Sequence, residues 1–141
     1  MAERESQREG VPVDPEMIAL MNGSMQAVTL AGQALMQAPG DIVITEEYTY
    51  SGTISAYKGI GLTMVGVAMD EQGMRMDALA DTLQKLQRSD QKVRFIYTLT
   101  TYQNPTGTCM PLSRKKQLLE IADRYQLPIV EDNCYGDVHF D

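Results

Sequence analysis

The chain has 141 residues, a length that permits one domain with a substantial core, and 43% of them are hydrophobic. The net charge of −7 argues against nucleic acid or an anionic membrane as a partner, because phosphate groups attract basic surfaces. No apolar run approaches the roughly 18–20 residues that span a bilayer. The charged segment 1–5 lacks the apolar centre of a signal peptide, so we expect a cytoplasmic protein.

The cysteines and the histidine give no sign of a metal site or of a disulfide framework. Cys109 and Cys134 lack metal-type spacing, and we expect both to be reduced thiols. His139 is the only histidine, which argues against a histidine-based metal site. We therefore expect no bound metal.

The beginning of the chain differs from the rest in its pattern. Residues 1–15 are polar and carry no apolar period, which predicts a poorly ordered loop or a frayed helix end. Residues 16–141 alternate apolar runs with helical patterns and predict a single domain. Its first element is a strand over 17–21, an apolar run closed by the turn signal Asn22-Gly23.

The next segments continue this alternation. Ser24 caps a predicted helix that extends to about Ala38, and Pro39-Gly40 ends it. A strand rich in β-branched residues follows. The elements predicted from there to the middle of the chain are a strand at 42–45, a short helix at 53–58, a strand at 62–67 and a polar turn at 70–73.

The second half repeats the pattern twice. Asp77 precedes a helix whose leucines at 79, 83 and 86 form one stripe, and a strand follows at 93–97. After the loop 101–110, Ser113 caps another helix, and a strand at 127–130 runs into Glu131-Asp132. Strands that alternate with helices indicate right-handed crossovers, so the predicted fold class is α/β, with a mostly parallel sheet flanked by helices on both faces.

The unusual residues of the chain follow these predicted strands. In an open parallel sheet, ligands bind at the carboxyl ends of the strands. Gly23 and Ser24 open a helix, where free amide groups favour an anion, although a plain serine cap explains them as well. Tyr50 and Tyr135 lie in two of the loops, where a tyrosine can also serve ordinary packing.

Two further polar residues stand out at strand ends. Asn104 begins the segment Asn-Pro-Thr-Gly, in which its side chain either contacts a ligand or satisfies its own loop. Asp132 directly follows an apolar strand, and a buried carboxylate needs a partner. A helix cap or a salt bridge with a basic side chain would also provide one.

Four loops hold these residues, around Gly23, Tyr50, Asn104 and Asp132. Together, these four loops resemble those of the class I/II aminotransferases, which belong to fold type I of the pyridoxal-phosphate enzymes. The most specific part is the segment 104–107, followed about twenty-five residues later by Glu131-Asp132 and Tyr135-Gly136. The segment 23–26, Gly-Ser-Met-Gln, is similar to the family's Gly-Ser-Gln-Gln phosphate loop. The segment 47–52, Glu-Tyr-Thr-Tyr-Ser-Gly, is similar to its Glu-Pro-Thr-Tyr-x-Gly. The nearest branch contains the 2-aminoadipate and kynurenine aminotransferases.

The resemblance implies pyridoxal 5'-phosphate as the cofactor, and it implies a role for each matching residue. The amides of Gly23, Ser24 and Met25 would hold the cofactor phosphate. Tyr50 would stack on the pyridine ring, and Asp132 would pair with its nitrogen. The ring's phenolic oxygen would accept hydrogen bonds from Asn104, which also lies close to the substrate carboxylate in this family, and from Tyr135.

The chain also departs from the family pattern. Met25 replaces a glutamine, Tyr48 a proline, and Asn133-Cys134 the common Asp-Pro. The family's Schiff-base lysine lies in a Ser-x-x-Lys setting beyond this segment, so we expect a partial large domain that has negligible activity alone. The implied reaction transfers an amino group between an amino acid and a 2-oxo acid. A homodimer is expected of the full-length enzyme, and self-association of the fragment.

Other functions remain open at this stage. The same fold also serves as a non-enzymatic domain that senses pyridoxal phosphate or an amino acid in transcription regulators. A lyase or decarboxylase on the same scaffold is a further alternative. A dinucleotide enzyme is disfavoured, because no Gly-x-Gly-x-x-Gly follows the first predicted strand.

Overall fold

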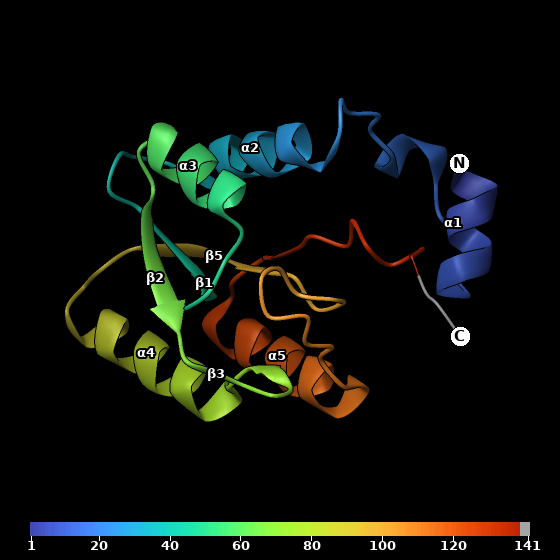
Figure 1. Ribbon diagram of the computed structural model, residues 1–141. Coiled ribbons are helices and arrows are strands. Elements are labelled where there is room, and N and C mark those ends of the chain that lie inside the picture. The colour runs from blue at the N-terminus through green and yellow to red at the C-terminus, as the bar shows by residue number, and fades with distance from the viewer. Residues whose placement is uncertain (139–141) are drawn as a thin grey trace.

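Four parallel strands form the centre of the computed structural model, which describes residues 1–138 (Figure 1). They are β1 (Ile42–Glu46), β2 (Thr63–Val67), β5 (Val93–Thr98) and β6 (Ile129–Glu131), in the order β2-β1-β5-β6. Every neighbouring pair is parallel. All four strands therefore end at one edge of the sheet, here called the carboxyl edge, and the predicted α/β class is confirmed.

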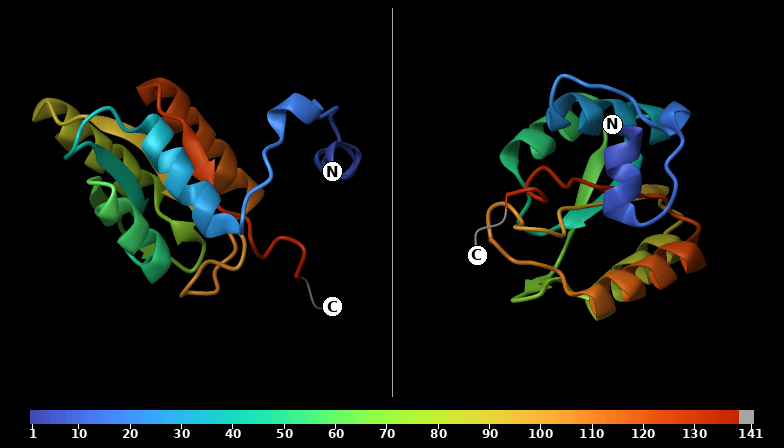
Figure 2. Two further views of the ribbon diagram at one scale, coloured as in Figure 1. Left: turned by 90° about the horizontal axis from the view of Figure 1, so that it is seen from above. Right: turned by 90° about the vertical axis from the view of Figure 1, so that its right-hand side faces the viewer.

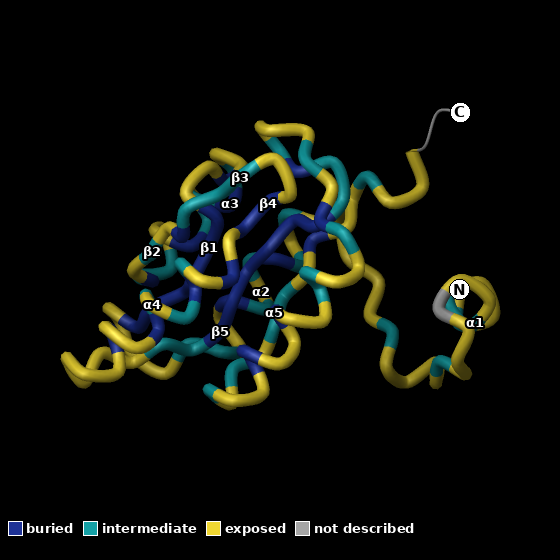
Figure 3. Tube along the Cα trace, turned by 90° about the horizontal axis from the view of Figure 1, so that it is seen from below, coloured by how far each residue is buried: buried dark blue, intermediate teal, exposed yellow. Residues whose placement is uncertain are grey.

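Two helices cover each face of this sheet (Figures 1 and 2). The helices α2 (Ser24–Leu35) and α3 (Ser51–Gly59) pack on one face, and α4 (Met76–Arg88) and α5 (Leu112–Tyr125) on the other. Helices on both faces exclude water from the central strands, whose trace is dark blue in Figure 3. The predicted two-sided covering of the sheet is confirmed.

Alternate side chains of the central strands enter two separate cores. Ile44 and Ile96 pack with the leucine stripe of α4, whereas Val43, Phe95 and Tyr97 pack against α2 and α3. This alternation follows from the period of two in a strand. Since both faces are apolar, the strands appear in the sequence as continuous rather than alternating apolar runs, as predicted for residues 42–45 and 93–97.

The prediction of a strand at 17–21 is wrong, because the structure has no strand there. A short 3-10 helix, η1 (Pro15–Met17), begins there because Asp14 accepts a hydrogen bond from the amide of Glu16 at 2.9 Å. The rest of the run is an extended arm, and Met17 and Leu20 are 83% and 77% exposed. A short apolar run does not reveal by its pattern whether a neighbouring strand will pair with it.

The first helix, α1 (Ala2–Glu9), lies away from the sheet (Figure 2) and contacts the C-terminal segment at one point. A surface ion pair between Arg4 and Asp137 links the two segments. Gly10 ends the helix in a left-handed conformation with φ 70°. The segment predicted as a loop or a helix end is thus largely a helix of eight residues.

Three helices begin or end at residues other than those predicted. Ser24 and Ser113 are not caps: α2 starts at Ser24 after Gly23, and α5 starts at Leu112 after Pro111. Asp77 lies inside the first turn of α4, where Arg75 binds it. Proline fixes the backbone before α5, so no serine cap is needed there.

The helix α2 ends at Leu35, and Asp41 organises the turn that follows. Its Oδ2 accepts the amides of Gln37 and Ala38 at 2.8 and 2.9 Å, and the Nε of Arg94 at 2.8 Å. The hydrogen bond from Arg94 is the main reason why the pKa of Asp41 is lowered to about 2. The carboxylate therefore stays charged although the residue is buried.

The predicted polar turn at 70–73 is confirmed, and it joins the two strands of a short hairpin. Its strands, β3 (Met69–Asp70) and β4 (Gly73–Met74), are antiparallel. Arg114 of α5 holds the hairpin through both oxygens of Asp70, at 2.5 and 3.0 Å, and through the carbonyl of Gly73 at 3.3 Å. The same arginine lowers the pKa of Asp70. A two-pronged guanidinium contact is a geometrically specific clamp.

Candidate functional site

Three of the four predicted site loops leave the sheet at its carboxyl edge. Glu46 ends β1, Thr98 ends β5, and Asp132 follows β6 directly. The fourth loop, Gly23 to Met25, follows the extended arm rather than a strand, so its predicted position after a first strand is wrong. It still reaches the same edge, because α2 packs along α3.

The beginning of α2 has the form of an anion site. Gly23 has φ 79° and ψ 167°, and no heavy atom lies within 4 Å of the place where a side chain would start. No side chain caps the helix, so the amides of Gly23, Ser24 and Met25 have no partner within it. These amides and the helix dipole favour a negative group, which can approach closely because Gly23 lacks a side chain.

Gly52 brings Tyr50 next to Met25. A methyl group on Gly52 would lie 2.5 Å from Cε1 of Tyr50 and 3.2 Å from the sulfur of Met25. The ring and the thioether therefore occupy the space beside the glycine. Tyr50 is 41% exposed, which leaves part of its ring available to another flat group.

Asp132 is 8% exposed, and its carboxylate is anchored from the strand beside it. Oδ2 accepts a hydrogen bond from the hydroxyl of Tyr97 at 3.0 Å, and the amide of Asp132 donates to the carbonyl of Thr98 at 2.9 Å. A basic partner or a helix cap was the alternative expected from the sequence. The observed partner is a neutral phenol, and no basic side chain within residues 1–138 forms a salt bridge with Asp132.

Asn104 and Tyr135 meet across the loops that follow β5 and β6. Nδ2 of Asn104 donates to the hydroxyl of Tyr135 at 3.3 Å. The backbone of the loop is hydrogen-bonded by Gln103 rather than by Asn104, since Oε1 of Gln103 accepts a hydrogen bond from the amide of Thr106 at 3.0 Å. The side chain of Asn104 is therefore not consumed by its own turn.

Hydrogen bonds and packing join these groups into one cluster. Gln103 donates to the carbonyl of Tyr48 at 2.5 Å, which ties the loop of Asn104 to that of Tyr50. Thr53, one residue after Gly52, contacts the Tyr97 hydroxyl at 3.1 Å and so connects α3 with Asp132. The seven residues singled out by the sequence thus belong to a single connected region. It combines a helix end without a side-chain cap, a partly exposed ring, a carboxylate and two neutral hydrogen-bonding groups.

Sequence reasoning missed Glu46, which lies under this region and is 2% exposed. Oε1 accepts from the hydroxyl of Thr98 at 2.5 Å and the amide of Leu99 at 3.1 Å, whereas Oε2 has no partner among the described residues. Burial raises the pKa of Glu46. Its signal in the sequence is the one that Asp132 gives, a carboxylate at the end of an apolar strand.

The lysines lie elsewhere. Lys92 binds Asp90 at 2.6 Å, at the start of β5. Lys115 binds Glu131 at 3.3 Å, and Glu131 faces α5, because Ile129 two residues earlier packs in that core. The remaining lysines are exposed on helices α3, α4 and α5: Lys58, Lys85 and Lys116.

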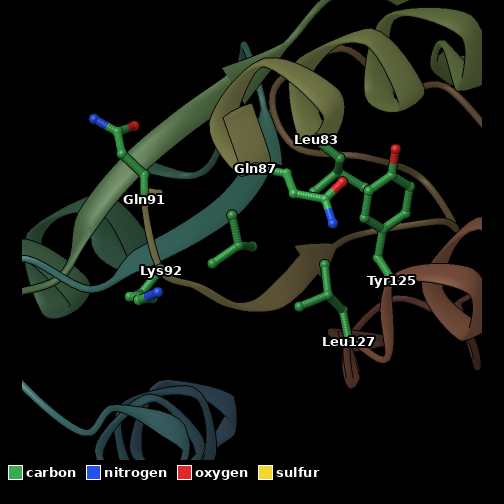
Figure 4. A pocket seen from close by; sticks show the side chains of 7 residues that line it. Leu83, Gln87, Gln91, Lys92, Tyr125 and Leu127 are labelled. Atoms are coloured by element: carbon green, nitrogen blue, oxygen red, sulfur yellow. The ribbon is translucent and has the colours of Figure 1, made fainter. Parts of the chain in front are cut away.

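A cavity of about 170 Å³ lies at the opposite edge of the sheet, between α4 and α5 (Figure 4). Leu83, Gln87, Tyr125 and Leu127 line it, with Lys92 at its border. It adjoins the start of β5, so it has no part in the cluster at the carboxyl edge. Within residues 1–138, no three acidic, histidine or cysteine side chains gather as a metal site would require. No described helix is long and apolar enough to cross a membrane.

Comparison with known proteins identifies the family to which the chain belongs. Residues 1–141 match the family model of aminotransferase class I and II. The chain belongs to this family. Aromatic-amino-acid aminotransferase 1 of Thermococcus litoralis is 38% identical over 140 residues, which is 99% of this chain and 33% of that protein. The 2-aminoadipate transaminase of Thermus thermophilus is 33% identical, over 94% of this chain and 32% of that protein.

A solved aminotransferase structure has the same fold. The crystal structure of an archaeal alanine:glyoxylate aminotransferase superimposes with a TM-score of 0.88 and 41% identity, over 93% of this chain and 32% of that one. The chain therefore spans about a third of the length of the aminotransferases that it matches. The resemblance to the aminotransferase family and to its 2-aminoadipate and kynurenine branch is confirmed, and the similar proteins also include aromatic-amino-acid aminotransferases.

Proposed function

We propose that this chain forms the cofactor-holding part of a pyridoxal-phosphate-dependent aminotransferase, which transfers an amino group between an amino acid and a 2-oxo acid. The observation that carries the proposal is the single cluster at the carboxyl edge. It joins the beginning of α2 to Asp132 and to the contact between Asn104 and Tyr135. The aminotransferase family uses this cofactor, and each part of the cluster matches one part of it in charge and shape.

The residues fit the cofactor as follows. The free amides at Gly23, Ser24 and Met25 would hold its phosphate, and the open space beside Gly23 admits it. Tyr50 would stack on one face of the ring. Asn104 and Tyr135, already in contact, would donate to its phenolic oxygen, and Asn104 would also border the substrate carboxylate.

Asp132 has the most specific role in this proposal. When bound, pyridoxal phosphate supplies an electron sink for the carbanion that forms as an amino acid loses its α-proton. The carboxylate of Asp132 favours a proton on the ring nitrogen, because an opposite charge nearby stabilises the charged form. Among the residues that the structure describes, no basic side chain pairs with Asp132, and its partner Tyr97 is neutral.

The isolated chain is expected to bind pyridoxal phosphate without turning over substrate. We propose that the lysine that binds the cofactor covalently belongs to another part of the whole protein, because Lys92 and Lys115 are paired with carboxylates and the other lysines are exposed on helices. A titration of the purified chain should give a saturable absorbance change at or below millimolar cofactor. No such change would contradict cofactor binding, and transamination with 2-oxoglutarate would contradict the absence of activity.

The rest of the protein distinguishes this function from its alternatives. A Ser-x-x-Lys motif there would support the enzyme, and a winged-helix domain there would support a sensing domain that binds the cofactor for regulation. Side chains that select between transamination and decarboxylation lie mostly outside this segment. A homodimer of the whole enzyme is part of the proposal, and sedimentation of the whole protein tests it.

Gly52→Ala should weaken cofactor binding by about tenfold, the order of one aromatic stacking contact. The new methyl group would stand 2.5 Å from the ring of Tyr50 and would turn that ring out of its place. Gly59→Ala is the matched control, because it lies in the same helix with open space beside it. Absorbance titration of both variants checks this expectation, and equal affinities would contradict the stacking role of Tyr50.

A further inference from the structure

The carboxylate of Asp132 is held by a hydrogen-bonded chain that starts in another layer of the molecule. Thr53 of α3 and Tyr97 of β5 are both fully buried, with no exposed surface. Their hydroxyl oxygens are 3.1 Å apart, and the hydroxyl of Tyr97 lies 3.0 Å from Oδ2 of Asp132. The phenol oxygen therefore stands between a hydroxyl and a carboxylate.

The chemistry of the three groups sets the direction of this chain. An ionised carboxylate only accepts hydrogen bonds, so Tyr97 is the donor to Asp132. Burial raises the pKa of Tyr97, so the phenol keeps its proton. Because the phenol proton points to Asp132, the phenol oxygen accepts the hydrogen bond from the hydroxyl of Thr53. Both hydrogen bonds are therefore donated in the same direction, from Thr53 to Tyr97 and from Tyr97 to Asp132.

The surroundings keep Tyr97 in place. Its ring packs edge-on against Tyr57, with centroids 5.6 Å apart and planes at 88°. Two other titratable groups face Asp132. Burial, and then the charge of Asp132, raises the pKa of both the Tyr57 hydroxyl and the Cys134 thiol, so both remain neutral. Of these protonated neighbours of Asp132, Tyr97 is the one that is both fully buried and hydrogen-bonded to the carboxylate through its hydroxyl.

We propose that Tyr97 is a positioning residue, which holds the Asp132 carboxylate toward the ring nitrogen of the cofactor and is itself aligned by Thr53. This inference rests on the proposed function, and it adds a role to a residue below the site. Donation to Oδ2 stabilises the negative charge on Asp132. Without this donation, the Asp132 carboxylate would attract a proton more strongly, and the ring nitrogen of a bound cofactor would be less protonated.

The first experiment needs no cofactor. In the 141-residue chain labelled at tyrosine, a hydroxyl proton that donates to a carboxylate should exchange slowly and resonate at low field. We expect this signal for Tyr97 and an upfield shift of it in Asp132→Asn, in which the acceptor loses its charge. Absence of a protected Tyr97 hydroxyl would overturn the inference whether or not the chain binds pyridoxal phosphate.

The second experiment measures the 15N resonance of the ring nitrogen in 15N-labelled pyridoxal phosphate bound to the chain. Tyr97→Phe should shift this resonance toward its unprotonated position and weaken binding roughly tenfold, and Thr53→Val should do both to a smaller extent. Tyr57→Phe is the matched control: it removes a hydroxyl of the same kind that makes no hydrogen bond in the described structure. We expect it to behave as the unmodified chain.

The outcomes separate the two proposals. A ring resonance that is equal in Tyr97→Phe and in the unmodified chain would overturn the positioning role and leave cofactor binding intact. An equal shift in Tyr97→Phe and Tyr57→Phe would overturn it too, because a general loosening of the core would then explain both. If the unmodified chain binds no cofactor, the proposed function fails and the role toward the ring fails with it, while the Tyr97 hydroxyl signal still reports the contact with Asp132.

Discussion

Asp132→Asn is expected to weaken the binding of pyridoxal phosphate by about a hundredfold or more. Removing one partner of a buried ion pair costs roughly 3–5 kcal/mol, and each 1.4 kcal/mol is about a factor of ten in affinity. Asparagine keeps an oxygen that accepts from Tyr97, so the free energy of unfolding without cofactor should change little. Absorbance titration measures the affinity, and urea denaturation measures the stability.

The matched control is Asp137→Asn. Asp137 belongs to the same C-terminal segment, and its exposed carboxylate pairs with Arg4 on the surface. An exposed ion pair contributes little, so this variant should bind the cofactor as the unmodified chain does. Equal affinity of Asp132→Asn and the unmodified chain would contradict a pairing between Asp132 and the ring nitrogen. A large loss of stability in Asp132→Asn would show instead that its role is structural.

Glu46→Gln is expected to raise the free energy of unfolding at pH 7 by about 1–3 kcal/mol, because the neutral amide avoids the desolvation cost of a buried charge. One oxygen of Glu46 is buried without a hydrogen bond. Its pKa is raised in the folded chain, so folding is favoured below the ordinary value of about 4.5 and loses that advantage as the pH rises through the folded pKa. The glutamine variant lacks this loss.

The gain should therefore depend on pH in a defined direction. Urea denaturation should show a small difference between Glu46→Gln and the unmodified chain at pH 4, and a growing advantage of the variant toward pH 8. Glu47→Gln is the control, since Glu47 is exposed and its Oε1 accepts from the amide of Met69. A variant that is less stable at every pH would show that the carboxylate stabilises the fold.

The central part of the fold was predictable because its sequence signals are local. The segments 42–45 and 93–97 are β-branched or aromatic runs, and a helix pattern with a clear apolar stripe lies between them. The run at 17–21 carried the same apolar signal without a strand beside it. Its exposed Met17 and Leu20 show that apolar composition alone does not produce a strand.

The residues proposed for the site could be chosen from the sequence, but their hydrogen-bond partners could not. Asp132 and Asn104 were visible because polar groups at strand ends are unusual. The hydrogen bonds to Tyr97 and Tyr135 join residues 35 and 31 positions apart, and no local pattern contains that information. Glu46 was missed because the resemblance directed attention to the loop after it.

The strand order has a kinetic consequence. Glu46 and Thr98 end two strands and Asp132 follows a third, and the contacts that join them span 34 to 52 residues of sequence. Contacts of such long range form late, because the chain must first lose the entropy of closing large loops. An intermediate with only the first crossover, β1 to β2, has no Asp132 beside it. Capture of the cofactor would thus report that the last strand has docked, and it would favour the completed fold over every partial one.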